Sequence, residues 1–208
     1  MITDSQIQAP PNLWKTVTGP DIGGPSPSAY AVVQGAPTSA SLTTFRTSGD
    51  KYSSWLGYSS RWIPPSASAF QMDFDLWIDA RVPKCAQTLE FDLKSKTFNF
   101  STHINIQSGW VWEIDKGGKW EPVAKITSLT PFTKHHIAIA GKFDAQTFSP
   151  LTLALDGKVY TVPPALQNQP CTNTDWTPGL ANIQIQQDAN DPGGAFEAQF
   201  DNLSIAWS

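Results

Sequence analysis

The feature that most constrains the fold of this chain is a period-2 alternation of apolar and polar residues in short segments. In segment 70–79 the apolar residues occupy every second position: Phe70, Met72, Phe74, Leu76 and Ile78. The same alternation recurs at 88–93 and 98–107. Because successive side chains of a β-strand point to opposite faces, the pattern predicts strands with one buried side. No segment shows a convincing 3.6-residue period, so the sequence predicts little helix.

Further strands are predicted between turn residues along the rest of the chain. They are segments 30–34, 41–47, 54–58, 109–114, 120–126, 135–142, 151–155, 158–162, 183–187 and 198–207. Gly117 and Gly118 supply the turn between two of these segments, and Asp156-Gly157 is a strong signal for a tight hairpin. The chain is therefore expected to be all-β, with about eleven to thirteen strands by this pattern.

The predicted architecture is a two-sheet antiparallel jelly-roll sandwich, since strands that are apolar on one face pack as two sheets around a core. Long gaps between the predicted strands are typical of Greek-key crossings rather than of an up-and-down barrel. Residues 1–28, rich in Pro, Gly, Ser and Thr, are interpreted as an extended N-terminal segment that adds one edge strand. Residues 29–208 are interpreted as a single β-sandwich domain.

Composition excludes several classes of function. Charged residues are 15% of the chain, the net charge is −4, and the 14 Lys and Arg are scattered, which argues against a nucleic-acid partner. No apolar run approaches the roughly 20 residues of a membrane span, and the first residues do not read as a signal peptide. Cys85 and Cys171 have no metal-ligand spacing and leave open one disulfide or two thiols.

The polar faces of the predicted strands carry amides, carboxylates, an imidazole and tryptophans instead of lysines. The predicted ligand-binding residues are Asp73, Asp75, Trp77, Glu90, Asp92, Ser101, His103, Asn105, Gln107, Trp120, Gln184 and Gln186. Planar amide and carboxylate groups pair with sugar hydroxyls, and the C–H face of a pyranose stacks on an indole ring. We therefore expect a polar, Trp-containing concave sheet face that recognises a glycan; the alternatives are a merely solvated sheet face and a catalytic site.

Glu90 and Asp92 are the candidate catalytic pair. Two residues apart on a strand, they leave the same face at positions about 6.5–7 Å apart. Glycosidases use such paired carboxylates, and His103 is a candidate general base or ligand contact. Two exposed acids on a strand and a hydrogen-bonded histidine would explain the same residues without catalysis.

The order of several short motifs resembles the concanavalin A-like lectin and glucanase sandwiches, and more narrowly the bacterial extracytoplasmic domains of that kind. The motifs are FQMDFDLWI at 70–78, QTLEFDL at 87–93, GWVW at 109–112, LALDGKVY at 153–160 and FDNLSIAW at 200–207. The resemblance implies two curved sheets with a concave ligand face, in lectins, carbohydrate-binding modules, glycoside hydrolases and polysaccharide lyases. It also implies a structural calcium in many members, for which Asp201 is the matching candidate.

The chain departs from the enzymes of this superfamily at two places. Leu93, Lys94 and Ser95 follow Asp92, so the third carboxylate of the hydrolase strand is missing. The Arg-rich strand and the Gln-x-His strand of the alginate-lyase-like sandwiches are missing as well. We therefore expect a carbohydrate-binding, lectin-like module that requires no cofactor, with a glycoside hydrolase or polysaccharide lyase using Glu90, Asp92 and His103 as the alternative.

A structural or adhesive module without a small ligand is the third hypothesis. The sequence further predicts a monomer with a polysaccharide partner, in a secreted or extracytoplasmic location.

Overall fold

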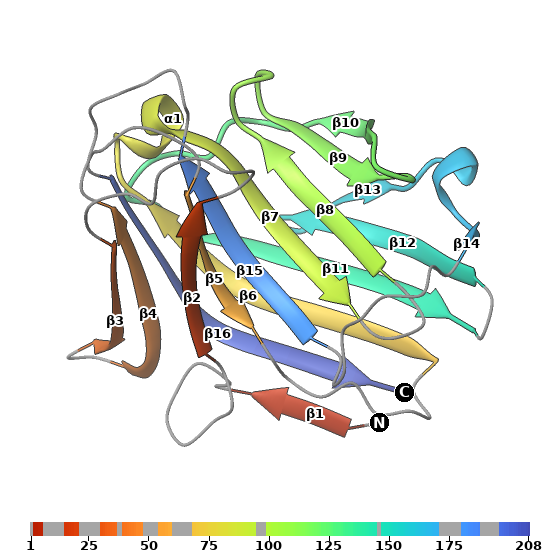
Figure 1. Ribbon diagram of the computed structural model, residues 1–208, viewed down its shortest axis with the longest axis horizontal. Coiled ribbons are helices and arrows are strands. Elements are labelled where there is room, and N and C mark those ends of the chain that lie inside the picture. The colour runs from red at the N-terminus through yellow and green to blue at the C-terminus, as the bar shows by residue number, and fades with distance from the viewer. Residues whose placement is uncertain are drawn as a thin grey trace.

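The computed structural model describes residues 2–5, 15–20, 30–36, 39–47, 54–59, 68–94, 99–144, 147–170, 180–187 and 196–208. It is a β-sandwich of two antiparallel sheets, A and B, which confirms the predicted all-β jelly-roll class. In Figure 1 sheet B lies toward the viewer and sheet A lies behind it. Helical structure in the described residues is limited to α1 (Val82–Cys85) and the 3-10 turn η1 (Pro164–Leu166).

Sheet A is built around the long strands β6 and β16. Its strands are β1 (Ile2–Ser5), β3 (Tyr30–Ala36), β4 (Ser39–Thr47), β6 (Ala69–Ile78), β11 (His135–Phe143), β12 (Thr147–Leu155), β13 (Lys158–Thr161), β14 (Gln169–Pro170) and β16 (Phe196–Trp207). The main order is β13-β12-β11-β6-β16-β4-β3, with β1 paired to β16 and β14 paired to β12. Three neighbouring pairs in this order, β11 with β6, β6 with β16 and β16 with β4, are far apart in sequence, as in Greek-key connections.

Sheet B is ordered β10-β9-β8-β7-β15-β5-β2. Its strands are β2 (Lys15–Pro20), β5 (Ser54–Ser59), β7 (Ala86–Lys94), β8 (Asn99–Asn105), β9 (Val111–Asp115), β10 (Trp120–Lys125) and β15 (Leu180–Gln187). The segment 1–28 thus supplies a strand to each sheet, β1 and β2, where the sequence predicted one. The boundary at residue 28 stays a prediction.

The core fills the space between the two sheets with the apolar residues of the alternating pattern. Phe74 of β6 contacts Phe91 of β7 across the sandwich, with ring centroids 5.3 Å apart. Phe148 of β12 lies 4.6 Å from Phe100 of β8 in the same way. Trp112 of β9 is fully buried. Burial of these rings contributes much of the folding free energy, because apolar area removed from water is stabilising at roughly 25 cal/mol per Å².

Two turns match the sequence prediction. Asp156 and Gly157 both have positive φ, 52° and 78°, as the tight turn between β12 and β13 requires. Between β9 and β10, Gly117 and Gly118 have φ of 64° and 86°, and the Asp115 carboxylate accepts the Gly118 amide at 2.8 Å. All the predicted strands of segments 30–207 are found, several with bounds shifted by a few residues.

The connection from β6 to β7 passes from sheet A to sheet B through α1 (Figure 1). Asp79 follows β6 and stabilises the turn into α1: its carboxylate accepts hydrogen bonds from the backbone amides of Arg81 at 2.8 Å and Val82 at 3.0 Å. The buried side chains of Val82 and Cys85 anchor the helix to the core. The consecutive strands β6 and β7 therefore lie in different sheets, so their polar residues do not meet.

Candidate functional site

A row of polar positions crosses four neighbouring strands on the outer face of sheet B. Register pairs Glu90 of β7 with His103 of β8, and His103 with Glu113 of β9. On the other side of β7, Gln184 of β15 pairs with Glu90. We call these four residues the cross-strand row. It lies at right angles to the strands, so an extended ligand lying along it would meet each strand once.

The other predicted residues of sheet B flank this row. Asp92 pairs with Ser101, and Thr88 pairs with both Asn105 and Gln186 in register. The structure therefore brings Glu90, Asp92, Ser101, His103 and Asn105 together on one face, as predicted. Gln184 and Gln186 join that face by register, and their side chains lie outside the described part of the chain.

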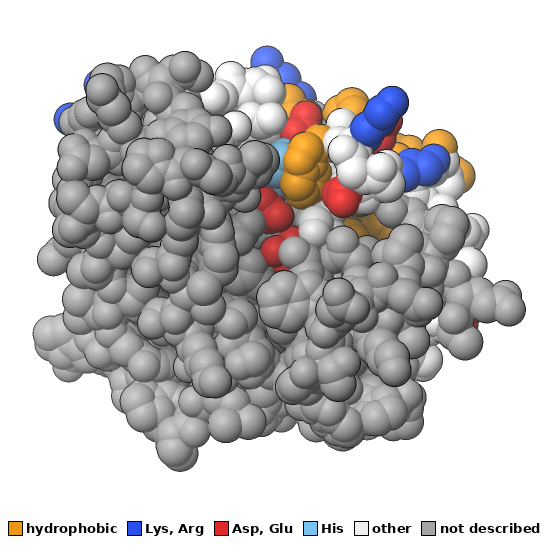
Figure 2. Space-filling view, in the orientation of Figure 1, with side chains coloured by type: hydrophobic (Ala, Val, Ile, Leu, Met, Phe, Trp, Pro, Cys, Tyr) orange, Lys and Arg blue, Asp and Glu red, His pale blue; other side chains and the backbone are white. Residues whose placement is uncertain are grey.

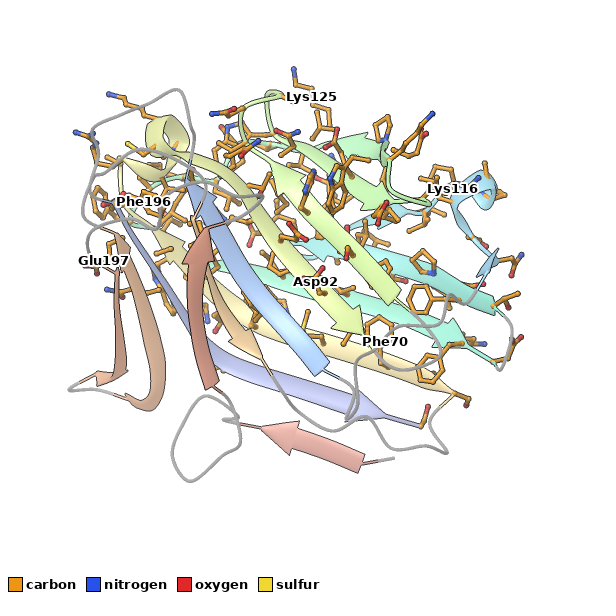
Figure 3. The ribbon with its side chains drawn as sticks, in the orientation of Figure 1. Phe70, Asp92, Lys116, Lys125, Phe196 and Glu197 are labelled. Atoms are coloured by element: carbon orange, nitrogen blue, oxygen red, sulfur yellow. The ribbon has the colours of Figure 1, made fainter. Side chains whose placement is uncertain are left out.

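The central residues of this face are buried although they point away from the core. Glu90 is 8% exposed, Asp92 1% and His103 4%. Figure 2 shows acidic side chains next to a histidine and a hydrophobic side chain on this face, and Figure 3 places Asp92 near the middle of sheet B. Since ionisable groups are rarely buried without a specific purpose, this burial distinguishes the face from a solvated sheet surface.

His103 is held from two sides. Its Nε2 lies 2.6 Å from Oε2 of Glu113, which also accepts the Asn105 amide at 3.0 Å. The imidazole stacks on the indole of Trp120, with ring centroids 3.7 Å apart and an interplanar angle of 24°. Trp120 begins β10 and pairs with Asp115, so the β9–β10 hairpin brings its ring over β8. These contacts fix the position and orientation of the ring.

Burial lowers the pKa of the His103 imidazole below its ordinary value. The hydrogen bond to Glu113, its charge and the charges of Asp92 and Asp115 oppose this shift without overcoming it. The neutral ring carries one N–H, and an Nε2–H donated to the Glu113 carboxylate leaves the Nδ1 lone pair as an acceptor. Nδ1 is buried and has no hydrogen-bond partner among the described residues.

The core beneath β8 and β9 sets the position of the His103–Glu113 pair. Thr102 points inward and donates its hydroxyl to the backbone carbonyl of Glu113 at 2.6 Å. The same hydroxyl oxygen accepts the Trp112 indole N–H at 3.0 Å. A buried hydroxyl with both bonds made is costly to disturb. The bond therefore ties β8 to β9 directly below His103 and Glu113.

Glu113 is the site residue that the sequence analysis did not select. Its signal was present, because Glu113 alternates with the core residues Trp112 and Ile114 and therefore points outward. What the sequence lacked was the pairing of β8 with β9. Gln107 behaves in the opposite way: it lies in the turn after β8 and is exposed, so it is not part of the strand face on which it was predicted.

Asp73, Asp75 and Trp77 do not share the face of the cross-strand row, and this prediction was wrong. All three lie on β6, which belongs to sheet A, and they point to the outer face of that sheet. The error has a physical cause: an antiparallel strand with one buried side has the same alternation in either sheet, and α1 moves the chain between the sheets. A ligand-binding role for these three residues stays a prediction.

Asp75 is the centre of a polar cluster on sheet A. Its carboxylate accepts the Asn202 amide at 2.8 Å and the Lys134 ammonium at 3.1 Å, and lies 3.0 Å from His136 Nδ1. Burial alone would raise the pKa of the Asp75 carboxyl, but the hydrogen bonds from Asn202, His136 and Lys134 outweigh it and lower the pKa. A bulge in β16 with Asn202 at φ 53° directs the amide toward Asp75.

Asp201 pairs in register with Asp75, and its side chain lies outside the described part of the chain. Within the described residues, no group of three or more His, Cys, Asp or Glu side chains is arranged to hold a metal ion. The Lys134 ammonium on Asp75 is a poor neighbour for a cation. The calcium assignment for Asp201 remains a prediction.

Comparison with known proteins identifies the fold. No protein-family model matches the sequence, and no curated protein matches it. Among solved structures, "Cellulose induced protein, Cip1" has a TM-score of 0.56 and 12% identity over 99% of this chain and 97% of that one. A glycosyl hydrolase family protein from Mycobacterium fortuitum has a TM-score of 0.55 and 12% identity, covering 99% of each chain.

The alginate lyase Aly36B has a TM-score of 0.53 and 8% identity over 80% of this chain and 81% of its own. At these identities the three structures share the jelly-roll sandwich with this chain, and the similarity extends to the fold alone. No helix among the described residues is long and apolar enough to cross a membrane.

Proposed function

We propose that the outer face of sheet B binds a polysaccharide chain. The observation that carries the proposal is the His103 ring held between the Glu113 carboxylate at 2.6 Å and the Trp120 indole at 3.7 Å. One face of that indole lies on the imidazole, and Trp120 remains 39% exposed. Its other side is thus available as a platform for the C–H face of a sugar, fixed in orientation before the sugar arrives.

The bound chain is inferred to be uncharged. The described side chains of β7, β8 and β9 include four carboxylates, Glu90, Asp92, Glu113 and Asp115, while Lys94, at the end of β7, has its side chain outside the described part of the chain. Their negative charge disfavours a polyuronate, and the half-buried carboxylates of Glu113 and Asp115 can accept hydrogen bonds from the hydroxyls of a neutral glycan. The names of the similar structures, which refer to a glycosyl hydrolase, an alginate lyase and a cellulose-induced protein, support a carbohydrate ligand in general terms.

Titration calorimetry with a panel of neutral polysaccharides, and with alginate as the anionic comparison, tests this proposal. Trp120→Ala removes the platform and is expected to weaken binding at least about tenfold, a loss of about 1.4 kcal/mol. Val159→Ala, which trims an exposed apolar residue of sheet A, is the matched control and should bind as the unaltered protein does. Binding of alginate alone, or equal binding by the two variants, would contradict the proposal.

Hydrolysis of the same glycan is a second candidate, favoured by the burial of Glu90 and Asp92 and by the neutral His103. The two carboxylates project from positions about 6.5–7 Å apart along β7, a spacing compatible with an acid and a base acting on opposite sides of a glycosidic bond. Glu113 would act as a positioning residue that holds the His103 tautomer with Nδ1 as proton acceptor.

A reducing-sugar assay on whichever polysaccharide binds separates these two functions. Hydrolysis predicts new reducing ends, and their loss in Glu90→Gln with binding retained. Release of the same amount of sugar by Glu90→Gln would remove Glu90 from the mechanism. Binding without any release of reducing ends would leave a lectin-like module.

A further inference from the structure

A cleft of about 460 Å³ lies on the outer face of sheet A. It is lined by Trp77 and Ile78 of β6, by Asp79 and Phe132, and by Glu197 and Gln199 of β16. Its volume is within the range of roughly 300–1,000 Å³ of small-molecule sites. Figure 3 shows Glu197 at the end of the sandwich near α1, well away from Asp92 on sheet B. The cleft is therefore separate from the cross-strand row.

Phe132 is the most unusual residue of this cleft. It is 74% exposed, and its backbone has φ of 60°, a conformation that is an outlier for a bulky residue. Its amide donates to the Ile78 carbonyl at 2.8 Å, which fixes the turn beside the end of β6. Folding gains little from an exposed ring on a strained backbone. Such outliers concentrate at ligand-binding sites, where the strain serves to present a group.

The polar side of the cleft is rigid. Gln199 pairs in register with Trp77, and its amide donates to the Glu197 carboxylate. The Asp79 carboxylate accepts the Glu197 backbone amide at 2.9 Å, as well as the two amides at the start of α1. Asp79 therefore holds the Glu197 backbone in place, while the hydrogen-bonded Glu197 and Gln199 side chains form a carboxylate–amide pair beside Trp77.

We propose that this cleft binds one uncharged pyranose residue. Trp77 and Phe132 supply apolar ring faces for the C–H groups of the sugar, and the Glu197–Gln199 pair meets neighbouring hydroxyls. None of the described lining residues is Lys or Arg, and two carboxylates, Asp79 and Glu197, are present, so an anionic sugar is repelled. A cage for an organic cation needs aromatic rings on several sides, and two rings line the described part of this cleft.

This inference does not depend on the function proposed for sheet B. It is tested by ¹H–¹⁵N NMR titration of the full chain with methyl β-glucopyranoside and methyl α-mannopyranoside, and with choline chloride as the cationic comparison. The expected result is a saturable shift of the Trp77 indole N–H and of the Phe132 and Gln199 backbone amides with at least one glycoside. Phe132→Gly should weaken that binding at least about tenfold, whereas Val159→Ala and Trp120→Ala should leave it unchanged.

Glycine tolerates the positive φ of position 132, so Phe132→Gly removes the ring without straining the turn, and a thermal melt within about 2 °C of the unaltered protein verifies the fold. A variant that falls outside this range is replaced by Trp77→Leu, which keeps an apolar side chain on β6 and removes the indole. Shifts confined to residues of sheet B, glycoside affinity unchanged in the folded variant, or binding of choline alone would overturn the proposal.

Discussion

The two outer faces of this sandwich carry the same kinds of side chain and use them in opposite ways. On sheet A the Asp75 carboxylate is surrounded by three hydrogen-bond donors that stabilise its charge, and its pKa is lowered. On sheet B burial destabilises the charged form of His103, and a ring nitrogen is left without a partner among the described residues. The polar cluster around Asp75 on sheet A therefore stabilises the fold, whereas the cluster around His103 on sheet B lowers its stability.

The largest effect is expected from Asp75→Ala on sheet A. Three donors lose a buried acceptor, so we expect a loss of about 1–3 kcal/mol in the free energy of unfolding, measured by urea denaturation. Lys134 and His136 are partly exposed and regain water, which keeps the loss from being larger. Asp73→Ala is the control, because the Asp73 carboxylate accepts hydrogen bonds from Gln71, lies 3.8 Å from His136 Nε2 and is more exposed than Asp75. Equal losses in the two variants would contradict the structural role of Asp75.

A smaller effect is expected from His103→Gln on sheet B. The amide of glutamine retains a donor for Glu113 and loses the ring contact with Trp120, which is worth about 0.5–1.5 kcal/mol, while the buried titratable group disappears. The free energy of unfolding at pH 7 should change by less than about 1 kcal/mol. A loss of unfolding free energy as large as that of Asp75→Ala would show that His103 stabilises the fold, and would contradict the proposed difference between the two faces.

The dependence of stability on pH should differ between the faces. The pKa of His103 is lowered in the folded state. Below about pH 6.5 the unfolded state therefore binds a proton that the folded state does not, and the free energy of unfolding decreases as the pH decreases. His103→Gln should therefore make the melting temperature depend less on pH between pH 7 and pH 5. Asp75 also has a lowered pKa, so its contribution persists above the ordinary carboxyl value and is lost only at lower pH, as the folded carboxyl is protonated. Asp75→Asn should therefore flatten the curve in that acidic range instead.

The smallest effect on stability is expected from Phe132→Gly. Relief of the positive φ and the higher entropy of glycine in the unfolded chain nearly offset one another, leaving a change below about 1 kcal/mol by thermal melting. A loss of several kcal/mol would mean that the Phe132 ring packs into the structure and is not held for a ligand.

The sequence predicted the strands and the class of fold because alternation is a local property. Segment 70–79 became β6, and Asp156-Gly157 became a hairpin turn with both φ values positive. Bounds shifted where a strand end depends on its neighbour: β8 ends at Asn105, and the turn that follows takes Gln107 off the strand.

The sequence predicted which residues lie on the outer face of sheet B better than it predicted which of them contact one another. Glu90, Asp92 and His103 could be placed on outward faces from alternation, but the contact of His103 with Glu113 depends on the register of β8 with β9. Trp77 was selected as a ligand platform and placed on the wrong surface, because the alternation does not record in which sheet a strand lies. Phe132 lies in a turn with positive φ, and a phenylalanine in the sequence does not indicate that conformation as a glycine or asparagine would.

The short crossing through α1 has a consequence for the behaviour of the whole domain. It turns the chain so that two consecutive strands present their polar sides in opposite directions. Binding surfaces on both outer faces would then hold two separate glycan chains, since a single chain would have to wrap around the edge of the sandwich to reach both. Such a domain would act as a cross-linker of a polysaccharide matrix, and its avidity would grow with the density of chains around it.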